Sequence, residues 1–256
     1  MKTIGFIGMG NMAGAIAAGI LQNGLMKKEA VFAYAPHYDK LVVNAEKIGF
    51  IPCKDLKELT AKTDTLIMAC KPYQIEGVLS EIKEELKGKA LISIAAGWNY
   101  DKYQDYLDDS TRLQFIMPNT PAMVGEGVLL FEEKNSLLPE EREEIKKLFE
   151  ALGIVIELMG IGGALTGCGP AFVDLIIEAL GDAGVKYGVP RKQAYEMVSQ
   201  MILGSAKLQL ETGDHPGVLK DNVCSPAGTT ICGVDALEHA GVRAGFIDAI
   251  DSIMKK

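Results

Sequence analysis

The fold is decided near the N-terminus by the stretch TIGFIGMGNMAGAIAAGILQN, residues 3–23. It divides into an apolar strand (3–7), a glycine turn and a small-residue helix (11–23). In the pattern Gly-x-Gly-x-x-Ala, Gly8 permits the tight turn, Gly10 lets the backbone approach a pyrophosphate, and Ala13 lets the helix pack on the strand. Unpaired N–H groups at the helix start attract anions. A bare packing turn is the alternative, but the context favours a dinucleotide pyrophosphate bound by Gly8, Met9, Gly10, Asn11, Met12 and Ala13.

The rest of the first half alternates short apolar runs with helical patterns. These runs predict strands at 3–7, 30–34, 63–69, 90–95, 113–117, 125–131 and 154–158. Helices are expected between them at 11–23, 39–48, 74–86, 100–107 and 139–152. Strands that are apolar on both faces and separated by helices are typical of a parallel sheet covered on both sides. We therefore predict an α/β fold with an N-terminal, Rossmann-type, mostly parallel sheet domain over residues 1–160.

The pattern changes after GIGG (160–163), a flexible joint beyond which no alternating strand pattern follows. Helices are predicted at 169–187, 190–212, 229–240 and 242–255, and GDHPG (213–217) breaks the second of them. A short helical array with apolar faces often completes its core with a second copy. We expect residues 161–256 to form an all-α domain that completes its core with a second copy of the chain.

Composition excludes several classes of protein. The 256 residues are 48% hydrophobic and 23% charged, which is enough apolar material for a core and excludes disorder. A net charge of −8 argues against a nucleic-acid or membrane partner. Five scattered cysteines do not suit a disulfide framework and indicate a reducing cytoplasm. The uncharged segment 3–26 also resembles a signal peptide, but its six glycines favour the strand, turn and helix.

The end of the second predicted strand bears on the choice of cofactor. It reads AYAPH (33–37) and lacks the Asp or Glu that would hold a ribose 2′-hydroxyl in an NAD site. An acidic side chain there would repel a 2′-phosphate, so its absence permits NADP. His37 and Lys40 are the nearest cationic candidates. We predict that NADP(H) is preferred, with NAD(H) also permitted.

Two further segments end strands at the edge of the sheet where ligands bind. Lys71 and Pro72 follow the strand 63–69, and Lys71 is placed to meet a cofactor phosphate or ribose; a solvent-facing lysine is the alternative. Ala95, Ala96 and Gly97 end the next strand without a bulky side chain. A nicotinamide lying across the strand ends needs such space, although tight packing alone also explains it.

Two segments are notable for their lack of charge. MPNTP (117–121) predicts a rigid turn that presents an amide and a hydroxyl, and DNVCSPAGTT (221–230) ends in a small-residue loop feeding a helix. Neutral hydrogen bonds and helix N–H groups there suit a carboxylate; a plain N-cap by Thr229 is the alternative. No Ser–His–Asp order and no metal-ligand spacing is present. Hydride transfer fits this inventory, because the cofactor carries the hard chemistry and the protein mostly positions the reactants.

Several motifs together resemble the pyrroline-5-carboxylate reductase family. They occur in the family's order between residues 5 and 230: GFIGMGNMA (5–13), KP (71–72), SIAAG (93–97), MPNTP (117–121), LTGCGPAF (165–172), HPGVLKDNV (215–223) and SPAGTT (225–230). The Ser-Pro-x-Gly-Thr-Thr element is the most specific of them, because generic Rossmann enzymes lack it.

The resemblance implies reduction of (S)-1-pyrroline-5-carboxylate to L-proline with NAD(P)H, the last step of proline biosynthesis. It implies that residues 161–256 are a dimerisation and substrate-binding domain, and that the protein is a homodimer or a larger homo-oligomer built on dimers. The active site is then completed across interleaved subunits. Carried over by position, Asn222, Thr229 and Thr230 bind the substrate, and Thr230 orients the ring nitrogen as the catalytic residue. The cofactor-binding residues implied are Gly8 to Ala13, Tyr34, Ala35, Pro36, Lys71, Pro72, Ala95, Ala96 and Gly97, and no metal is implied.

Departures from the family pattern leave alternatives open. Cys168 and Cys224 replace a usual Ser or Thr, Ala227 a common Gly, and Phe115 a frequent Arg. These changes bear on substrate preference more than on the fold. The alternatives are a reductase of another small cyclic imine or of a β-hydroxy acid, and a catalytically impaired paralogue that binds nucleotide as a sensor.

Overall fold

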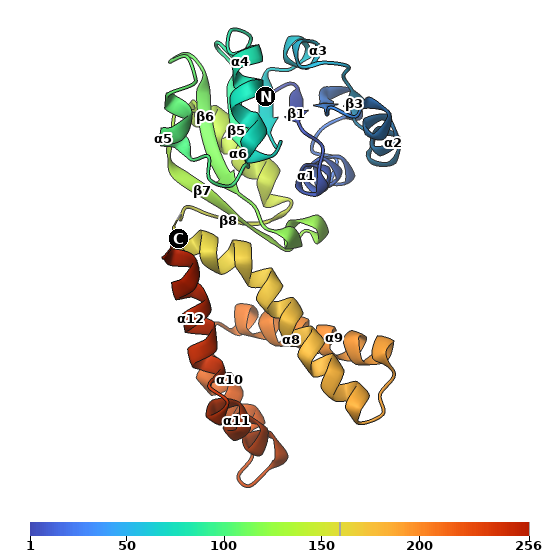
Figure 1. The fold of residues 1–256 in the computed structure, drawn as a ribbon, viewed down its shortest axis with the longest axis vertical. Helices are drawn as coiled ribbons and strands as arrows, with labels where there is room; N and C mark the ends of the chain where they lie inside the picture. The colour runs from blue at the N-terminus through green and yellow to red at the C-terminus, as the bar shows by residue number, and fades with distance from the viewer. Residues whose placement is uncertain (159, 256) are drawn as a thin grey trace. The chain divides into compact units, whose positions relative to one another are not determined.

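The computed structural model describes residues 1–158 and 160–255, which form two compact units. One unit spans Met1–Gly167 and the other begins at Cys168. We expected the domain boundary after residue 160; the break between the compact units falls seven residues later. The first unit holds the sheet, and the second is entirely helical over its described residues (Figure 1).

A single eight-stranded sheet forms the centre of the first unit, in the order β3-β2-β1-β4-β5-β6-β7-β8. Its strands are β1 (Ile4–Ile7), β2 (Val31–Tyr34), β3 (Ile51–Pro52), β4 (Thr65–Met68), β5 (Ala90–Ser93), β6 (Arg112–Met117), β7 (Gly127–Asn135) and β8 (Gly153–Ile156). All neighbours pair in parallel except β6 and β7. The mostly parallel sheet of the prediction is confirmed, and the order of the first six strands is that of the Rossmann fold.

Helices cover both faces of this sheet (Figure 1). They are α1 (Asn11–Gln22), α2 (Tyr38–Ile48), α3 (Leu56–Lys62), α4 (Ile75–Ile82), α5 (Tyr100–Gln104), α6 (Pro139–Glu150) and the short α7 (Ile161–Gly163). Successive strand residues point to opposite faces, so Phe6 packs with the buried residues of α1, α2 and α6, whereas Ile7 packs with those of α3, α4 and α5. The uncharged N-terminal segment is thus part of a core, with Ile16 and Ile20 of α1 fully buried.

Two glycines bring β7 and β8 together where their pairing begins. Gly153 has φ +143°, and a Cβ atom on it would lie 1.9 Å from the carbonyl oxygen of Gly127. The two residues are direct partners in the parallel ladder, and Gly127 also donates a hydrogen bond to Leu152. A side chain at position 153 therefore cannot be accommodated without moving the backbone of β7.

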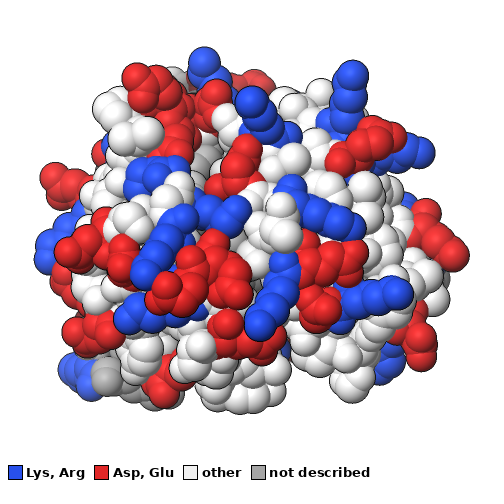
Figure 2. Space-filling model, turned by 90° about the horizontal axis from the view of Figure 1, so that it is seen from above, with Lys and Arg blue, Asp and Glu red and all other residues white. Residues whose placement is uncertain are grey.

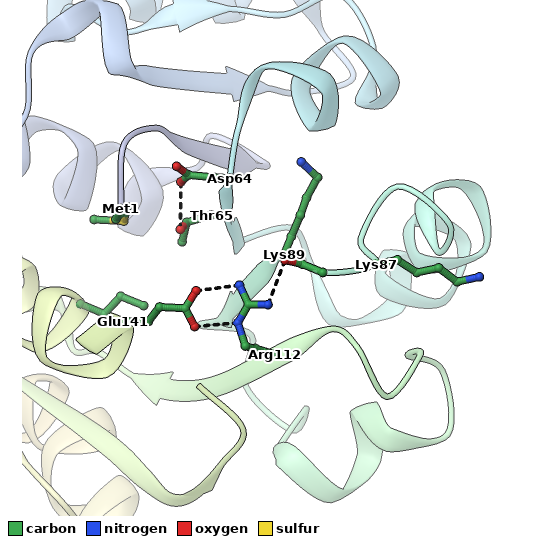
Figure 3. A pocket seen from close by; sticks show the side chains of 9 residues that line it. Met1, Asp64, Thr65, Lys87, Lys89, Arg112 and Glu141 are labelled. Atoms are coloured by element: carbon green, nitrogen blue, oxygen red, sulfur yellow. Dashed lines mark hydrogen bonds and ion pairs between the residues drawn. The ribbon is translucent and has the colours of Figure 1, made fainter. Parts of the chain in front are cut away.

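The amino edge of the sheet carries a pocket of about 360 Å³ whose polar groups bind one another (Figure 3). Arg112 donates to both carboxylate oxygens of Glu141, at 2.7 and 2.6 Å, and to the carbonyl oxygen of Gly88. The Arg112 guanidinium lowers the pKa of the Glu141 carboxyl. Lys89 Nζ also has a protein partner, since it donates a hydrogen bond to the carbonyl oxygen of Thr63 at 2.6 Å. The two-point contact between Arg112 and Glu141 fastens α6 to β6 and pairs the two charges with each other.

Charge is mixed over the face of the molecule seen in Figure 2. Lysine and arginine side chains alternate there with aspartate and glutamate, and neither sign gathers into a broad patch. No basic stripe of the kind that binds nucleic acid is visible on this face.

The second unit consists of α8 (Gly169–Lys186), α9 (Arg191–Thr212), α10 (Pro216–Val223), α11 (Thr229–His239) and α12 (Val242–Met254). The sequence did not lead us to expect α10, because Pro216 and Gly217 read as breakers. Proline is tolerated at the first helical position, and His215 caps the helix by accepting a hydrogen bond from the Gly217 N–H through Nδ1.

This helical unit has almost no interior of its own. Among its described residues only Gly181 and Ala194 are buried, while Leu175, Leu203 and Leu210 are more than half exposed. The helical stretch Ile161–Lys186 is long and apolar enough to cross a membrane, and only 11% of that apolar window is buried within this single chain. Exposed apolar side chains over so much of a helical unit indicate a surface that is buried against another protein surface.

We expect Gly153→Ala to lower the free energy of unfolding by about 2–4 kcal/mol, because both backbone strain and overlap with Gly127 are introduced. Gly88→Ala is the matched control, since Gly88 also has a positive φ (+72°) but nothing lies near its Cβ position. Its cost should be about 1–2 kcal/mol. Thermal unfolding at one fixed protein concentration measures both; equal losses would contradict the overlap.

Candidate functional site

The carboxyl ends of four central strands lie level with one another. Ile7 pairs with Tyr34 on one side and Met68 on the other, and Met68 pairs with Ser93. The loops leaving β1, β2 and β4 therefore meet at one edge, where they line a cleft of about 720 Å³. The direction of the crossovers reverses on either side of β1, and ligands of open α/β sheets bind at such a point.

The cleft brings together much of the predicted cofactor site. Of the predicted residues its lining includes Gly8, Met9, Gly10, Tyr34, Ala35, Pro36 and Lys71. Outside the lining lie Asn11, Met12, Ala13, Pro72, Ala95, Ala96 and Gly97. Ala13 is buried, at 1% exposure, and packs in the core below the turn.

The glycine turn is closely packed at Gly8 and open at Gly10. Gly8 has φ +95°, and a Cβ atom on it would lie 2.8 Å from the backbone nitrogen of Cys70. Its N–H donates to the carbonyl oxygen of Tyr34 at 2.8 Å, which ties the turn to β2. Gly10 has no atom within 4 Å of its Cβ position, so the space above it is open. No side chain caps the start of α1, and its first N–H groups are available to an anion.

The end of β2 carries no acidic side chain toward the cleft. Tyr34, Ala35, Pro36 and His37 line it there, and Glu81 of α4 is the one acidic residue of the lining. The sequence prediction of a site without the ribose-binding carboxylate at β2 agrees with this geometry.

The loop after β4 and the helix α4 that follows it supply residues that the sequence did not lead us to expect. Cys70, Tyr73, Gln74, Gly77, Val78 and Glu81 all line the cleft. Burial raises the pKa of the Cys70 thiol to about 11, so the thiol is neutral at physiological pH and is a poor nucleophile. Residues 74, 77, 78 and 81 have the spacing of one helix face. This spacing could have been found in the sequence, because the helix follows a strand that ends at the binding edge of the sheet.

Buried hydrogen bonds to Ser93 support Ala95 and its neighbours at the end of β5. Ala95 is buried, whereas Ala96 and Gly97 are exposed and Gly97 has φ +77°. Beneath them the Tyr103 hydroxyl donates to Ser93 Oγ at 2.9 Å, and Ser93 Oγ also accepts from the Ala95 N–H. The small residues are therefore held in place by buried hydrogen bonds one layer below.

The predicted substrate-binding residues lie in the helical unit. Asn222 is exposed on α10, and Thr229 and Thr230 are the exposed first two residues of α11. The alternative of an N-cap by Thr229 is wrong: Gly228 is the N-cap, and no side chain forms the cap hydrogen bond. The N–H groups at this helix start are thus free for a carboxylate, and neither threonine hydroxyl forms a hydrogen bond among the described residues.

The loop before α11 contains strained backbone. Ala227 has φ +58° and is the one non-glycine residue with positive φ in the described part of the chain. Next to it, a Cβ atom on Gly228 would lie 2.3 Å from Ser225 Oγ. Strain of this kind persists only where its surroundings impose it and is frequent at ligand sites. It also gives a physical reason for a glycine preference at position 227.

Asn119 does not present its amide to a ligand, and that expectation is wrong. The residue is 7% exposed. Its Nδ2 donates to the carbonyl oxygen of Thr166 at 3.0 Å, and its Oδ1 accepts from the Val128 N–H at 2.9 Å. Through these two hydrogen bonds, the buried Asn119 side chain links β7 to the residues that precede α8. Among residues 1–158 and 160–255, no group of three or more His, Cys, Asp or Glu is placed to hold a metal.

Comparison with known proteins shows which family the chain resembles over its whole length. Residues 157–256 match the family model for pyrroline-5-carboxylate reductase dimerisation, and residues 3–97 match that for NADP oxidoreductase, coenzyme F420-dependent. The chain is 38% identical to the pyrroline-5-carboxylate reductase of Escherichia coli over 100% of its own length and 97% of the relative's. It is 39% identical to that of Methanosarcina acetivorans, over 97% and 94%.

A solved structure shares the whole fold. Pyrroline carboxylate reductase of Plasmodium falciparum with NADP bound superposes with a TM-score of 0.90 at 32% identity, covering 99% of this chain and 96% of that one. Fold and cleft together define an oxidoreductase of the dinucleotide-binding class. The chain belongs to the pyrroline-5-carboxylate reductase family, so the resemblance stated from the motifs is confirmed.

We expect Gly10→Val to weaken NADPH binding by at least about tenfold, because its side chain would fill the space where the backbone must meet the pyrophosphate. The fold should tolerate it, since nothing lies near the Cβ position. Fluorescence titration with NADPH measures the affinity, and thermal unfolding verifies the fold. Unchanged affinity in a folded variant would refute the role of the turn.

Ala227→Gly should raise the free energy of unfolding by about 0.5 kcal/mol. It removes a left-handed penalty of about 1–2 kcal/mol, against about 0.4–1 kcal/mol for the freer unfolded chain. Ala61→Gly in α3 is the control and should instead lose about 1 kcal/mol. Calorimetry at fixed protein concentration compares the three proteins. A loss for Ala227→Gly as large as that of the control would show that position 227 is unstrained.

Proposed function

We propose that the protein reduces (S)-1-pyrroline-5-carboxylate to L-proline with NAD(P)H, the last step of proline biosynthesis. The observation that carries the proposal is the open, uncapped glycine turn at the switch point of a Rossmann sheet. It occurs in a chain whose full-length relatives are pyrroline-5-carboxylate reductases.

The cofactor half of the site is assigned to the first unit. Gly8 to Ala13 bind the pyrophosphate through backbone N–H groups, Tyr34 to Pro36 flank the adenosine ribose, and Lys71 and Pro72 line the cofactor further along. Ala95, Ala96 and Gly97 leave room for the nicotinamide ring. When bound, the reduced nicotinamide supplies the hydride. Because no carboxylate from the end of β2 faces a 2′-phosphate and His37 lines the cleft, NADPH is the preferred cofactor and NADH a permitted one.

The substrate half is assigned to the helical unit. Asn222, Thr229 and the free N–H groups at the start of α11 bind the carboxylate of the cyclic imine. The Thr230 hydroxyl orients the ring nitrogen and fixes the face of the C=N bond. A protonated imine is already electrophilic, so the chain needs to provide position and desolvation rather than a strong acid.

We further propose a cytoplasmic homodimer or a larger assembly of dimers, with residues 1–160 binding NAD(P) and residues 161–256 forming the dimerisation and substrate-binding domain. Support comes from the burial pattern of the helical unit. Only two of its described residues are buried, and a second copy would cover its exposed apolar side chains. All five cysteines are free thiols, in keeping with a reducing compartment.

The proposal is tested by following NADPH and NADH oxidation with purified protein and pyrroline-5-carboxylate, and by identifying the product. Rapid formation of proline, faster with NADPH, is expected. Tight nucleotide binding without proline would overturn the proposed activity and favour another cyclic imine or a sensor.

We expect Thr230→Ala to lower kcat by about tenfold or more, because loss of one orienting hydrogen bond removes about 1–2 kcal/mol from the transition state. NADPH affinity should change less than twofold, and Thr230→Ser should restore most of the rate. Steady-state kinetics with direct cofactor titration separates these effects. Wild-type kinetics in the alanine variant would remove the substrate-site assignment.

A further inference from the structure

Tyr73 is the most exposed large apolar side chain in the described part of the chain. Its side chain is 83% exposed, and it lies in the wall of the cofactor cleft, between Lys71 and Gln74. It forms no hydrogen bond and no pair with another aromatic ring among the described residues. The folded chain itself therefore gives no reason for an aromatic ring at this position.

The backbone that carries this ring is fixed. Tyr73 is the middle residue of a single turn, η2 (Pro72–Gln74). The Lys71 N–H donates to Gln74 Oε1 at 3.1 Å, and the Gln74 N–H donates to the Lys71 carbonyl oxygen at 2.9 Å. Pro72 further restricts the turn. A ring on a fixed turn loses little conformational freedom when a ligand packs against it.

The position in the cleft indicates which part of a dinucleotide the ring meets. The pyrophosphate is assigned to the turn at Gly8 to Gly10, and the nicotinamide to the small residues that follow β5. Tyr73 shares the cleft with Pro36 and His37 at the end of β2, the strand on the other side of β1. The adenosine end of the cofactor is the part left to fill this region, and its base offers a planar π-face.

We propose that Tyr73 provides the stacking surface for the adenine ring of the bound dinucleotide, an assignment that rests on the proposed function. Stacking of a base on an aromatic side chain contributes about 1–3 kcal/mol. Tyr73 is then a residue that sets cofactor affinity and has no part in the chemical step.

The test uses three variants and two ligands that divide the cofactor. We expect Tyr73→Ala to raise the Kd for NADPH by about tenfold. The Kd for adenosine 2′,5′-bisphosphate should rise by a similar factor, whereas that for reduced nicotinamide mononucleotide should not change. Tyr73→Phe, which keeps the ring, should bind like the wild type, and Tyr73→Leu, which keeps the bulk, should resemble the alanine variant. Calorimetric titration on the full-length protein measures every affinity directly.

The possible failures are distinguishable. If wild-type protein binds NADPH and Tyr73→Ala binds it equally well, the stacking role is overturned while the proposed function stands. Equal weakening of both half-ligands also overturns it, since a general disturbance of the cleft would be the cause. If wild-type protein binds neither NADPH nor NADH, the proposed function fails and the assignment of Tyr73 fails with it.

Discussion

The site depends on the closeness of two backbones, where the end of β1 passes the end of β4. At Gly8 the chain turns so near to Cys70 that any side chain would overlap the Cys70 nitrogen at 2.8 Å. This contact directs the chain from β1 straight into α1, so that the first N–H groups of that helix face the edge where β2 and β4 also end. Because β2 and β4 lie on opposite sides of β1, the connections that leave these two strands run in opposite directions and the cleft stays open between them. Nothing larger than a hydrogen atom at position 8 is compatible with this arrangement.

The cleft differs from the pocket at the amino edge of the same sheet in how its polar groups are used. At the amino edge, the charged groups of Arg112 and Glu141 satisfy one another, and the result is a fastening between α6 and β6. At the carboxyl edge, the N–H groups of the first turn of α1 have no side-chain partner. A ligand can bind N–H groups that have no protein partner, so the carboxyl edge is the location that we propose for the cofactor.

Much of the fold could be predicted from the sequence because its signals are local. The glycine turn, the buried strands and the long helices each follow from spacing and composition within about twenty residues. The failures have physical causes as well. β3 is only two residues long and has no periodicity to detect. α10 begins with Pro216, which is tolerated at the first helical position, and His215 caps the helix by accepting from the Gly217 N–H. The amide of Asn119 was expected to be free, but its partners at Val128 and Thr166 are brought near only by the tertiary fold. Tyr73 was overlooked because a single exposed ring has no pattern around it.

The helical unit by itself buries only two of its residues in the range 168–255, so its stability depends on the concentration of a second copy. On the proposed dimer, the threonines that we assign to substrate binding belong to a domain whose core forms only when two chains associate. The amount of active enzyme then falls faster than the amount of protein once expression drops near the dissociation constant. Halving the gene dose would remove more than half of the working sites under those conditions, whereas the nucleotide-binding unit, with a core of its own, would be lost only in proportion.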